Sequence, residues 1–239
     1  MQDVDLIIRR RTLLVAAVAG LLAGCSTTTP PIQTVSLTAP AGDDPLPAAL
    51  AIYAAMPQEE FPIPAVDLGQ VEPRFRRQVV EYPTNEKVGT LIVDTPNKFL
   101  YHVLPGGKAM RYGIGVGRDG FSWSGRATVA YKRAWPKWTP PDEMVARDPR
   151  LRPVSKENGG MPPDLRNPLG ARALYIHQGG KDTLYRLHGT PEAFSIGKAV
   201  SSGCIRLLNQ DVIDLYNNVR DGSTIVVLPD PSMREQPGA

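Results

Sequence analysis

Apolar and polar positions alternate in short runs from about residue 88 onward, a pattern typical of β-strands. Residues 89–95 and 98–104 are rich in β-branched and aromatic side chains and flank Pro96 and Asn97, so they predict a β-hairpin. Between residues 135 and 170 the chain is rich in proline and predicts an irregular passage with one short helix near 142–146. Further strands are expected over 110–116, 126–134, 173–178, 183–188 and 224–228.

One amphipathic helix is expected near the C-terminus. Four apolar residues recur at the spacing i, i+3, i+4 and i+7, and so share one helical face. They are Val212, Leu215, Tyr216 and Val219. Asn209 is a residue type that caps helix N-termini, and Gly222 is a type that ends helices. The pattern therefore predicts a mainly β domain with one strong helix.

The first 25 residues have the features of an export signal. Arginines at 9–11 precede an apolar run over 13–23, and a run of that length is too short to span a bilayer. The run ends in Leu22-Ala23-Gly24-Cys25, which resembles a bacterial lipobox. We therefore expect residues 1–24 to be a signal peptide and Cys25 to carry a lipid anchor. The arginine triplet fits both general secretion and twin-arginine export.

A proline-rich segment separates this signal from the expected domain. Ten prolines lie between residues 26 and 87, where they repeatedly block helices and sheet ladders. Apart from one short helix within 48–56, we expect residues 25–87 to be a semi-extended tether. Residues 88–229 are the expected folded domain, and residues 230–239 a polar tail.

Composition and charge exclude several classes of protein. A net charge of +3 over 239 residues is too small to indicate a nucleic-acid partner. The only cysteines are Cys25 and Cys204, which excludes both a disulfide framework and a four-cysteine zinc site. The three histidines, His102, His177 and His188, show no metal-ligand spacing. Neither a metal nor a cofactor is expected.

An unpaired cysteine in an exported protein suggests a functional thiol, so Cys204 is the candidate nucleophile. A cysteine nucleophile requires a base, since the thiol is mostly protonated at neutral pH. His188 ends an expected strand sixteen residues earlier, and that gap can hold a loop that returns the chain and places imidazole and thiol side by side. The residues alone leave open a buried cysteine that packs as a small hydrophobe and a histidine that is merely polar.

The residues around this pair resemble the L,D-transpeptidase catalytic domain, also called the YkuD domain. The likeness rests on His188-Gly189-Thr190 and on Ser201-Ser202-Gly203-Cys204-Ile205-Arg206, and it extends over about residues 88–228. It includes Asn167-Pro168-Leu169-Gly170, whereas Ser202 stands where many members have histidine. The resemblance implies a mainly β fold, a β-sandwich of mixed sheets with one strong helix after the catalytic loop.

What the resemblance implies chemically is acyl transfer through a cysteine thioester. Cys204 would attack the carbonyl that precedes the terminal D-alanine of a peptidoglycan tetrapeptide stem, and His188 would protonate the departing D-alanine. A side-chain amine of a second stem would then take the acyl group, giving a 3→3 cross-link between diaminopimelate residues. Gly203 and Ser201 are assigned to the catalytic loop and the oxyanion site.

Three further residues are expected at the substrate. Arg206 is a planar cation suited to a stem carboxylate, although a structural ion pair explains it equally well. Gly189 follows the base directly. His177, on the preceding strand, either lines the site or is an ordinary strand histidine.

The acyl acceptor stays open at this point. Water as acceptor would give an L,D-carboxypeptidase or endopeptidase, and an envelope protein as acceptor would become attached to peptidoglycan by the same acyl-enzyme. A non-enzymatic alternative is an inactive lipoprotein that tethers the membrane to peptidoglycan. The expected location is the periplasm, with the lipid anchor in the outer membrane because Ser26 follows the lipidated cysteine.

Overall fold

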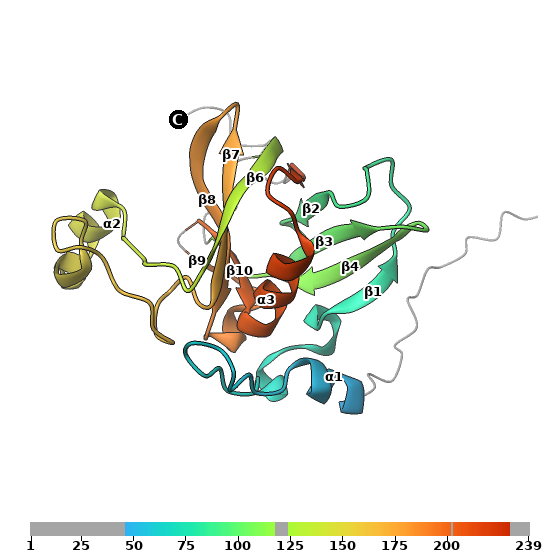
Figure 1. Cartoon of the computed structure of the whole chain (residues 1–239), viewed down its shortest axis with the longest axis horizontal. Coiled ribbons are helices and arrows are strands. Elements are labelled where there is room, and N and C mark those ends of the chain that lie inside the picture. The colour runs from blue at the N-terminus through green and yellow to red at the C-terminus, as the bar shows by residue number, and fades with distance from the viewer. Residues whose placement is uncertain (1–45, 118–123, 202, 230–239) are drawn as a thin grey trace, which may run out of the picture. The chain divides into compact units, whose positions relative to one another are not determined.

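The structure, a computed structural model, describes residues 46–117, 124–201 and 203–229 (Figure 1). The expected signal peptide, Cys25, the start of the tether, Ser202 and the polar tail lie outside these residues. The helices are α1 (Leu46–Ile52), α2 (Asp142–Arg147) and α3 (Asn209–Asn218), and the 3-10 turns are η1 (Leu68–Gln70), η2 (Pro73–Phe75), η3 (Pro149–Val154) and η4 (Ala193–Ser195). The strands are β1 (Gln78–Glu81), β2 (Leu91–Asp94), β3 (Phe99–Leu104), β4 (Lys108–Gly113), β5 (Val116–Gly117), β6 (Gly125–Ala134), β7 (Arg172–Gln178), β8 (Lys181–Thr190), β9 (Ala199–Ser201), β10 (Ile205–Leu208) and β11 (Thr224–Val227).

Nine of the strands form one sheet in the order β1-β4-β3-β2-β11-β6-β7-β8-β10. Neighbours are antiparallel except for the pairs β2–β11 and β8–β10, so the sheet is mixed. β5 and β9 pair in parallel as a separate two-stranded sheet. The expected mainly β fold with mixed sheets and one strong helix after the catalytic loop is confirmed.

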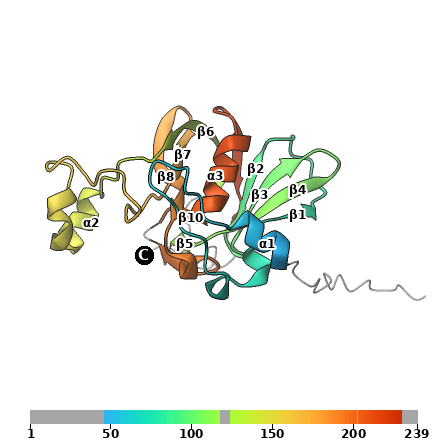
Figure 2. The ribbon, with the colours of Figure 1, turned by 60° about the horizontal axis from the view of Figure 1, so that its bottom comes forward.

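The helix α3 lies between two halves of the large sheet, with β6, β7 and β8 on one side and β2, β3 and β4 on the other (Figures 1 and 2). Its predicted apolar face is buried, since Val212 and Leu215 are fully enclosed. Both belong to the main apolar core, together with Leu174, Leu187 and Leu207 from the strands. Each such side chain stabilises the fold by about 1.5–3 kcal/mol by leaving water.

Asn209 does not cap α3 as the sequence predicts. It is the first residue of the helix, and Leu208 stands at the cap position without a side-chain hydrogen bond. The Asn209 side chain is buried, and its Oδ1 accepts from the Ala171 backbone N–H at 3.0 Å. A contact between distant segments has therefore recruited the side chain, which fastens the start of α3 to the loop before β7.

The hairpin predicted at the start of the domain is confirmed. β2 and β3 run antiparallel, with Leu91 opposite His102 and Asp94 opposite Phe99. In the turn, Asp94 Oδ1 accepts from the Asn97 backbone N–H at 3.1 Å. A short polar side chain thus closes the turn, as expected for asparagine and aspartate at such positions.

Residues 46–87 differ from the expected tether, because they pack on the domain instead of extending from it. Tyr53, Val71 and Phe75 are buried and form an apolar cluster with Ile196 and Leu208. The strand β1 lengthens the large sheet by pairing with β4. The prolines interrupt regular ladders, but they do not prevent apolar side chains between them from being buried.

Buried polar groups also anchor this segment to α3. Arg77 Nη1 lies 2.8 Å from Asp214 Oδ1, and Arg77 Nε lies 3.6 Å from Asp211 Oδ1. The Tyr53 hydroxyl donates to Asp211 Oδ2 at 3.2 Å. Burial raises the pKa of Asp211 to about 7, against the lowering effect of Arg77. One carboxyl of the network therefore titrates near neutrality.

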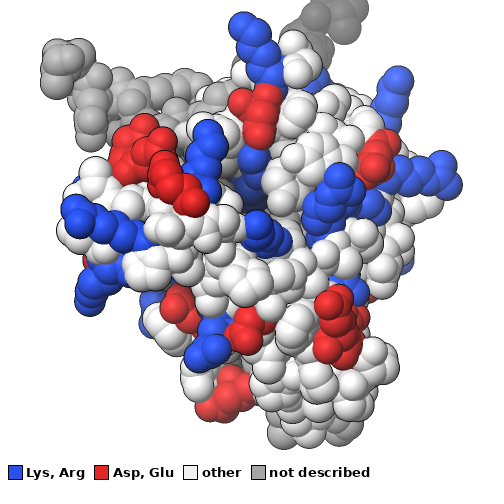
Figure 3. Space-filling view, turned by 60° about the vertical axis from the view of Figure 1, so that its left-hand side comes forward, with Lys and Arg blue, Asp and Glu red and all other residues white. Residues whose placement is uncertain are grey.

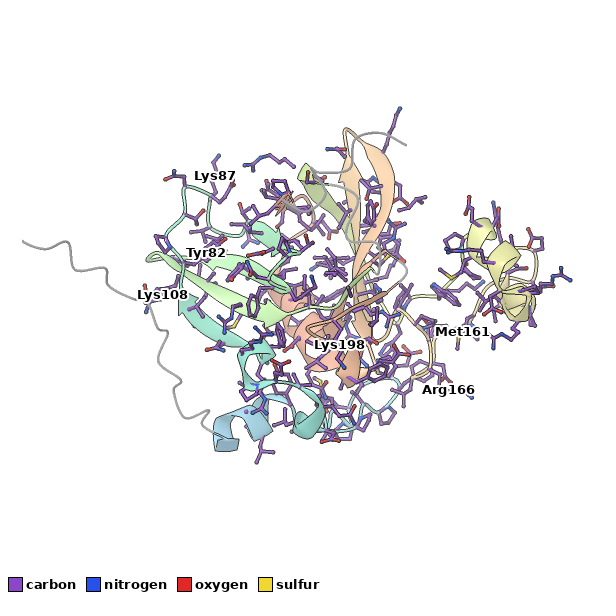
Figure 4. All side chains as sticks on the ribbon, turned by 180° about the vertical axis from the view of Figure 1, so that it is seen from behind. Tyr82, Lys87, Lys108, Met161, Arg166 and Lys198 are labelled. Atoms are coloured by element: carbon purple, nitrogen blue, oxygen red, sulfur yellow. The ribbon has the colours of Figure 1, made fainter. Side chains whose placement is uncertain are left out.

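The irregular passage predicted between β6 and β7 is present and projects from the sheet with α2 at its end (Figures 1 and 2). Trp138 and Met161 exchange backbone hydrogen bonds where the passage leaves and rejoins the domain. Figure 4 shows Met161 and Arg166 between α2 and the sheet. The short helix expected near 142–146 is α2.

Candidate active site

Two parallel strands place His188 and Arg206 on one face of the sheet, and Cys204 directly precedes the second of these strands. β8 and β10 pair with Arg206 opposite His188 and Ile205 opposite Leu187. Leu187 and Ile205 point into the core, and side chains alternate between the two faces of a strand, so His188 and Arg206 lie on the opposite face. Cys204 directly precedes β10 and stands two residues before Arg206.

The His188 imidazole is buried and held by backbone carbonyls. Only 4% of the residue is exposed, and Nδ1 lies 2.7 Å from the Gly189 carbonyl oxygen. Because a carbonyl can only accept, Nδ1 carries the proton of the neutral ring and Nε2 keeps the lone pair. Burial, with the positive charges of Arg206 and Arg186, lowers the pKa of His188 to about 4, although hydrogen bonds to the Gly189 and Pro168 backbones oppose this. The imidazole is therefore neutral at pH 7.

The half-buried Cys204 thiol lies beside β8. Its Sγ lies 3.9 Å from the Leu184 carbonyl oxygen. Burial raises the pKa of the thiol, whereas a hydrogen bond with the Arg186 backbone and the charges of Arg186 and Arg206 act to lower it. The net direction is upward, so the thiol is protonated at neutral pH. A neutral thiol and a neutral imidazole suit general-base catalysis rather than a preformed thiolate.

Gly203 precedes the thiol in a backbone conformation that residues with side chains rarely adopt. Its φ is 129°. A Cβ atom at this position would meet nothing closer than Tyr185 Cε1 at 4.0 Å, so the glycine serves the backbone conformation and not the available space. Ser201 ends β9, which pairs with β5. The Ser201 side chain lies outside the described part of the chain.

Gly189 is buried where β8 meets the start of α3. A Cβ atom at Gly189 would lie 2.3 Å from Asn209 Oδ1 and 3.0 Å from Val212 Cγ1. At Gly170 a Cβ atom would lie 2.4 Å from the same asparagine oxygen. The two glycines thus allow the loop before β7, strand β8 and the start of α3 to meet. This close approach fixes the Gly189 carbonyl that holds His188.

Arg206 forms an ion pair, which is one of the two roles expected for it. Its Nη1 lies 2.6 Å from Glu192 Oε2, and its side chain is 18% exposed. The Arg206 backbone also exchanges hydrogen bonds with Gly115, at 2.9 Å in each direction. These contacts hold the guanidinium where its charge lowers the pKa of both His188 and Cys204.

His177 lies on β7 away from the His188 imidazole. It stands opposite Asp182, whereas Ala173, four residues earlier, stands opposite His188. At about 3.3 Å per residue, the two histidines are about 13 Å apart along the strands. The His177 ring packs edge-to-face on Tyr131, with centroids 5.9 Å apart. The structure therefore does not place His177 beside His188.

The role of the turn at residues 167–170 in holding the imidazole was not predicted from the sequence. Asn167 is fully buried; its side-chain amide donates to the Pro162 carbonyl at 3.0 Å, and its Oδ1 accepts from the Leu169 N–H at 2.9 Å. This side chain fixes the turn whose Pro168 backbone hydrogen bonds to His188. An asparagine before Pro-Leu-Gly is a recognisable turn signal, but its burial depends on segments far away in the sequence.

Charge is mixed on the surface near this side of the sheet. Figure 3 shows lysines and arginines interspersed with aspartates and glutamates, without a broad area of one sign. Within the described residues, no group of three or more His, Cys, Asp and Glu side chains is arranged to hold a metal ion. None of the described helices has both the length and the apolar character of a membrane span.

A family model matches more than half of the chain: the model of the L,D-transpeptidase catalytic domain, YkuD, matches residues 89–228. Two Escherichia coli K12 proteins are similar in sequence. The probable L,D-transpeptidase YcfS is 33% identical over 150 residues, which are 59% of this chain and 44% of that protein. The probable L,D-transpeptidase ErfK/SrfK is 32% identical over 152 residues, which are also 59% of this chain and 44% of that protein. The chain thus spans less than half the length of these relatives.

Two solved structures are also similar. A Brucella melitensis protein described as a probable carnitine operon oxidoreductase is 43% identical, with 68% of this chain and 99% of that chain covered and a TM-score of 0.46. L,D-transpeptidase 3 from Mycobacterium tuberculosis is 18% identical, with 59% and 61% covered and a TM-score of 0.42. At such TM-scores the superpositions carry no weight for fold or function.

Proposed function

Because the chain belongs to the family of L,D-transpeptidase catalytic domains, we propose that it forms 3→3 cross-links in peptidoglycan through a thioester on Cys204. The observation that carries the proposal is the pairing of β8 with β10, which sets His188 opposite Arg206, two residues after Cys204, together with a protonated thiol and a neutral imidazole. The donor substrate is a tetrapeptide stem that ends in D-alanine. The product contributes to cell wall biogenesis.

The first half-reaction forms the thioester. The Nε2 lone pair of His188 takes the proton from Cys204, and the sulfur attacks the carbonyl carbon between diaminopimelate and D-alanine. The backbone N–H groups of Gly203 and Cys204 stabilise the oxyanion. The carbon–nitrogen bond then breaks, and the imidazolium returns its proton to the nitrogen of the departing D-alanine. The free thiol has become a thioester, and D-alanine carries the proton.

The second half-reaction transfers the acyl group. The side-chain amine of a diaminopimelate residue on another stem attacks the thioester while His188 removes an amine proton. The carbon–sulfur bond breaks, and the sulfur takes that proton back as the thiol. The new amide is the 3→3 cross-link, and the enzyme returns to its starting state.

The surroundings of the two groups support this proton transfer. The Gly189 carbonyl keeps Nδ1–H hydrogen bonded while the ring becomes positive, so the imidazole need not rotate. Arg186 and Arg206 favour the thiolate as it develops, since both lower the pKa of Cys204. The same charges disfavour the imidazolium, so the ion pair does not accumulate before substrate arrives.

Two other acceptors would use the same acyl-enzyme. Water would make the protein an L,D-carboxypeptidase or endopeptidase, and an envelope-protein amine would lead to protein attachment. An inactive tethering lipoprotein is the non-enzymatic alternative. Cross-linking is favoured because the matched family and the two E. coli relatives are described as transpeptidases.

Mass spectrometry of digested cell wall separates these possibilities. Cells that lack the protein are complemented with wild type, Cys204→Ala or, as the matched control, His177→Ala. We expect 3→3 dimers to return with wild type and His177→Ala and to stay absent with Cys204→Ala. A change confined to trimmed tripeptides, or to stems that carry protein, would replace cross-linking by one of the other acceptors. Dimers restored by Cys204→Ala would end the proposal.

The location of the protein is part of the same proposal. Residues 1–24 act as a signal peptide, and lipidated Cys25 holds the enzyme at the periplasmic face of the outer membrane, with Ser26 as the sorting residue. Residues 25–45 are the tether, and residues 230–239 the polar tail. Cys25→Ala should shift the protein from the membrane fraction to the soluble periplasmic fraction, or leave it misprocessed. Unchanged processing and membrane fractionation of this variant would refute the anchor.

A further inference from the structure

The strand β8 contains a bulge directly beside the thiol. Its pairing with β7 shifts between Arg186, which is opposite Tyr175, and Asp182, which is opposite His177. One residue of β7 therefore faces three residues of β8, and the middle one, Leu184, has a φ of 63°. Glycine adopts this left-handed region readily, whereas leucine does so at a cost. The conformation of Leu184 must be imposed by its surroundings.

Side chains of the bulge hold it in place. Asp182 Oδ1 accepts from the Leu184 backbone N–H at 2.8 Å, and the two carboxylate oxygens pair with the Arg186 guanidinium at 2.7 and 2.8 Å. Thr183 Oγ1 donates to the Ile176 carbonyl of β7 at 2.7 Å. The Leu184 side chain is 73% exposed, so its own packing does not explain the strained backbone.

The bulge presents its backbone to the nucleophile. The Leu184 carbonyl oxygen lies 3.9 Å from Cys204 Sγ, and the Arg186 backbone also hydrogen bonds with the thiol. A carbonyl oxygen accepts from S–H and repels a thiolate, whereas the Arg186 backbone contact lowers the pKa of the thiol. Of the two contacts, the Leu184 carbonyl is therefore the one that favours the neutral thiol. The charged groups that act on the thiol are Arg186 on β8 and Arg206 on β10.

We propose that the bulge at residues 182–185 is a positioning device for the nucleophile. Asp182 and Leu184 are positioning residues: the first ties the bulge, and the second presents the carbonyl that orients the Cys204 thiol and keeps it protonated until substrate displaces the contact. The inference rests on the proposed function in taking this thiol as the nucleophile. A neutral resting thiol would react slowly with small electrophiles, which suits a cysteine exposed to an oxidising compartment.

Two variants at one position test the backbone requirement without changing charge. Leu184→Gly adopts the left-handed conformation easily and should leave the dependence of iodoacetamide alkylation on pH unchanged. Leu184→Ile, which is β-branched, disfavours that conformation and should release the carbonyl. Its thiol should then alkylate about three- to tenfold faster at pH 7, the change expected when a thiol pKa falls by about half a unit to one unit.

Asp182→Asn provides the second arm, with Asp148→Asn as its matched control. Asp148 likewise accepts from a backbone N–H two residues on (3.2 Å) and pairs with an arginine, Arg150, in the passage between β6 and β7. Asp182→Asn should alkylate faster than wild type, yet release D-alanine from a tetrapeptide stem about ten- to a hundredfold more slowly, because its sulfur is no longer oriented. Asp148→Asn should match wild type in both assays. A purely structural role for Asp182 would lower turnover without accelerating alkylation.

The outcomes separate this inference from the proposed function. Equal alkylation profiles in wild type, Leu184→Gly and Leu184→Ile would overturn it, and so would a Leu184→Gly profile as altered as that of Leu184→Ile. If Leu184→Ile fails to fold, the other two variants still test the inference. An alkylation profile of Leu184→Gly that differs from wild type, or one of Asp182→Asn that does not, overturns it. If the variants show altered alkylation profiles but the wild-type protein releases no D-alanine, the role of the bulge is supported and the proposed function is rejected.

Discussion

Replacing His188 by glutamine should change how the stability of the protein depends on pH. The wild-type imidazole has a pKa of about 4 in the folded protein and about 6.5 in the unfolded chain. The unfolded chain therefore binds this proton more tightly, so stability falls as the pH falls from about 6.5 to about 4. Above that window this group makes no pH-dependent contribution. His188→Gln has no such group and lacks this loss.

The magnitude follows from the difference between the two pKa values. A difference of about 2.5 pH units, at about 1.4 kcal/mol each, corresponds to about 3 kcal/mol of unfolding free energy. Since His188 is only 4% exposed, solvent does little to reduce this value. Relative to His188→Gln, the wild type should lose about 3 kcal/mol between pH 7 and pH 4.

A single acid titration of the wild type would hide this effect. Burial raises the pKa of Asp211 from 3.8 to about 7, so the folded protein binds that proton more tightly than the unfolded chain. Its contribution to stability therefore grows as the pH falls through nearly the same window, against that of His188. The difference between wild type and His188→Gln removes the Asp211 contribution, because both proteins contain it.

The assay is urea unfolding at pH 7 and pH 4, followed by tryptophan fluorescence, to which the buried Trp135 contributes. Asp211→Asn serves as a control of opposite sign: relative to it, the wild type should gain stability as the pH falls. If the difference in unfolding free energy between wild type and His188→Gln is the same at pH 7 and pH 4, the buried, neutral imidazole is refuted.

Three further changes test the close packing and the nucleophile. Gly189→Ala should lower the free energy of unfolding in urea by about 1–3 kcal/mol, because its Cβ atom would overlap Asn209 Oδ1; unchanged stability would show that this junction can relax. Gly203→Ala should still unfold cooperatively in urea, since space is open around its Cβ atom. It should form no acyl-enzyme in intact-mass spectra, because a residue with a side chain disfavours the φ of 129°. Normal acylation of this variant would contradict the role of Gly203. A carbapenem should add once to wild type and not to Cys204→Ser in the same spectra, and an adduct that persists in the variant would mean another nucleophile.

Local patterns were sufficient for much of the fold. The β2–β3 hairpin follows from β-branched runs around a turn, and α3 follows from the helical spacing of Val212, Leu215 and Val219. These elements could be predicted because each is determined by residues close in sequence. The same logic failed for residues 46–87, where burial of Tyr53 and Phe75 depends on Ile196 and Leu208, more than a hundred residues away.

The sequence singled out the candidate reactive groups, whose roles stay a prediction, but not the contacts that support them. Cys204 and His188 stood out by residue type and spacing, while Asn209 was expected to cap a helix and instead binds the loop before β7. The bulge at Leu184 has no local signal, because its Thr-Leu-Tyr sequence fits a regular strand and the strain comes from Asp182 and the partner strand. Supports of this kind are set by tertiary contacts, which a single sequence does not display.

The most direct test of the central claim is D-alanine release by the purified protein from a disaccharide-tetrapeptide. Wild type should release D-alanine while dimers joined 3→3 appear in the mass spectrum. Cys204→Ser should release none, and His188→Gln should release it at least about 10²-fold more slowly. Combining the two changes should cost little more than Cys204→Ser alone, because the pair acts as a unit. Release by Cys204→Ser at the wild-type rate would contradict the account.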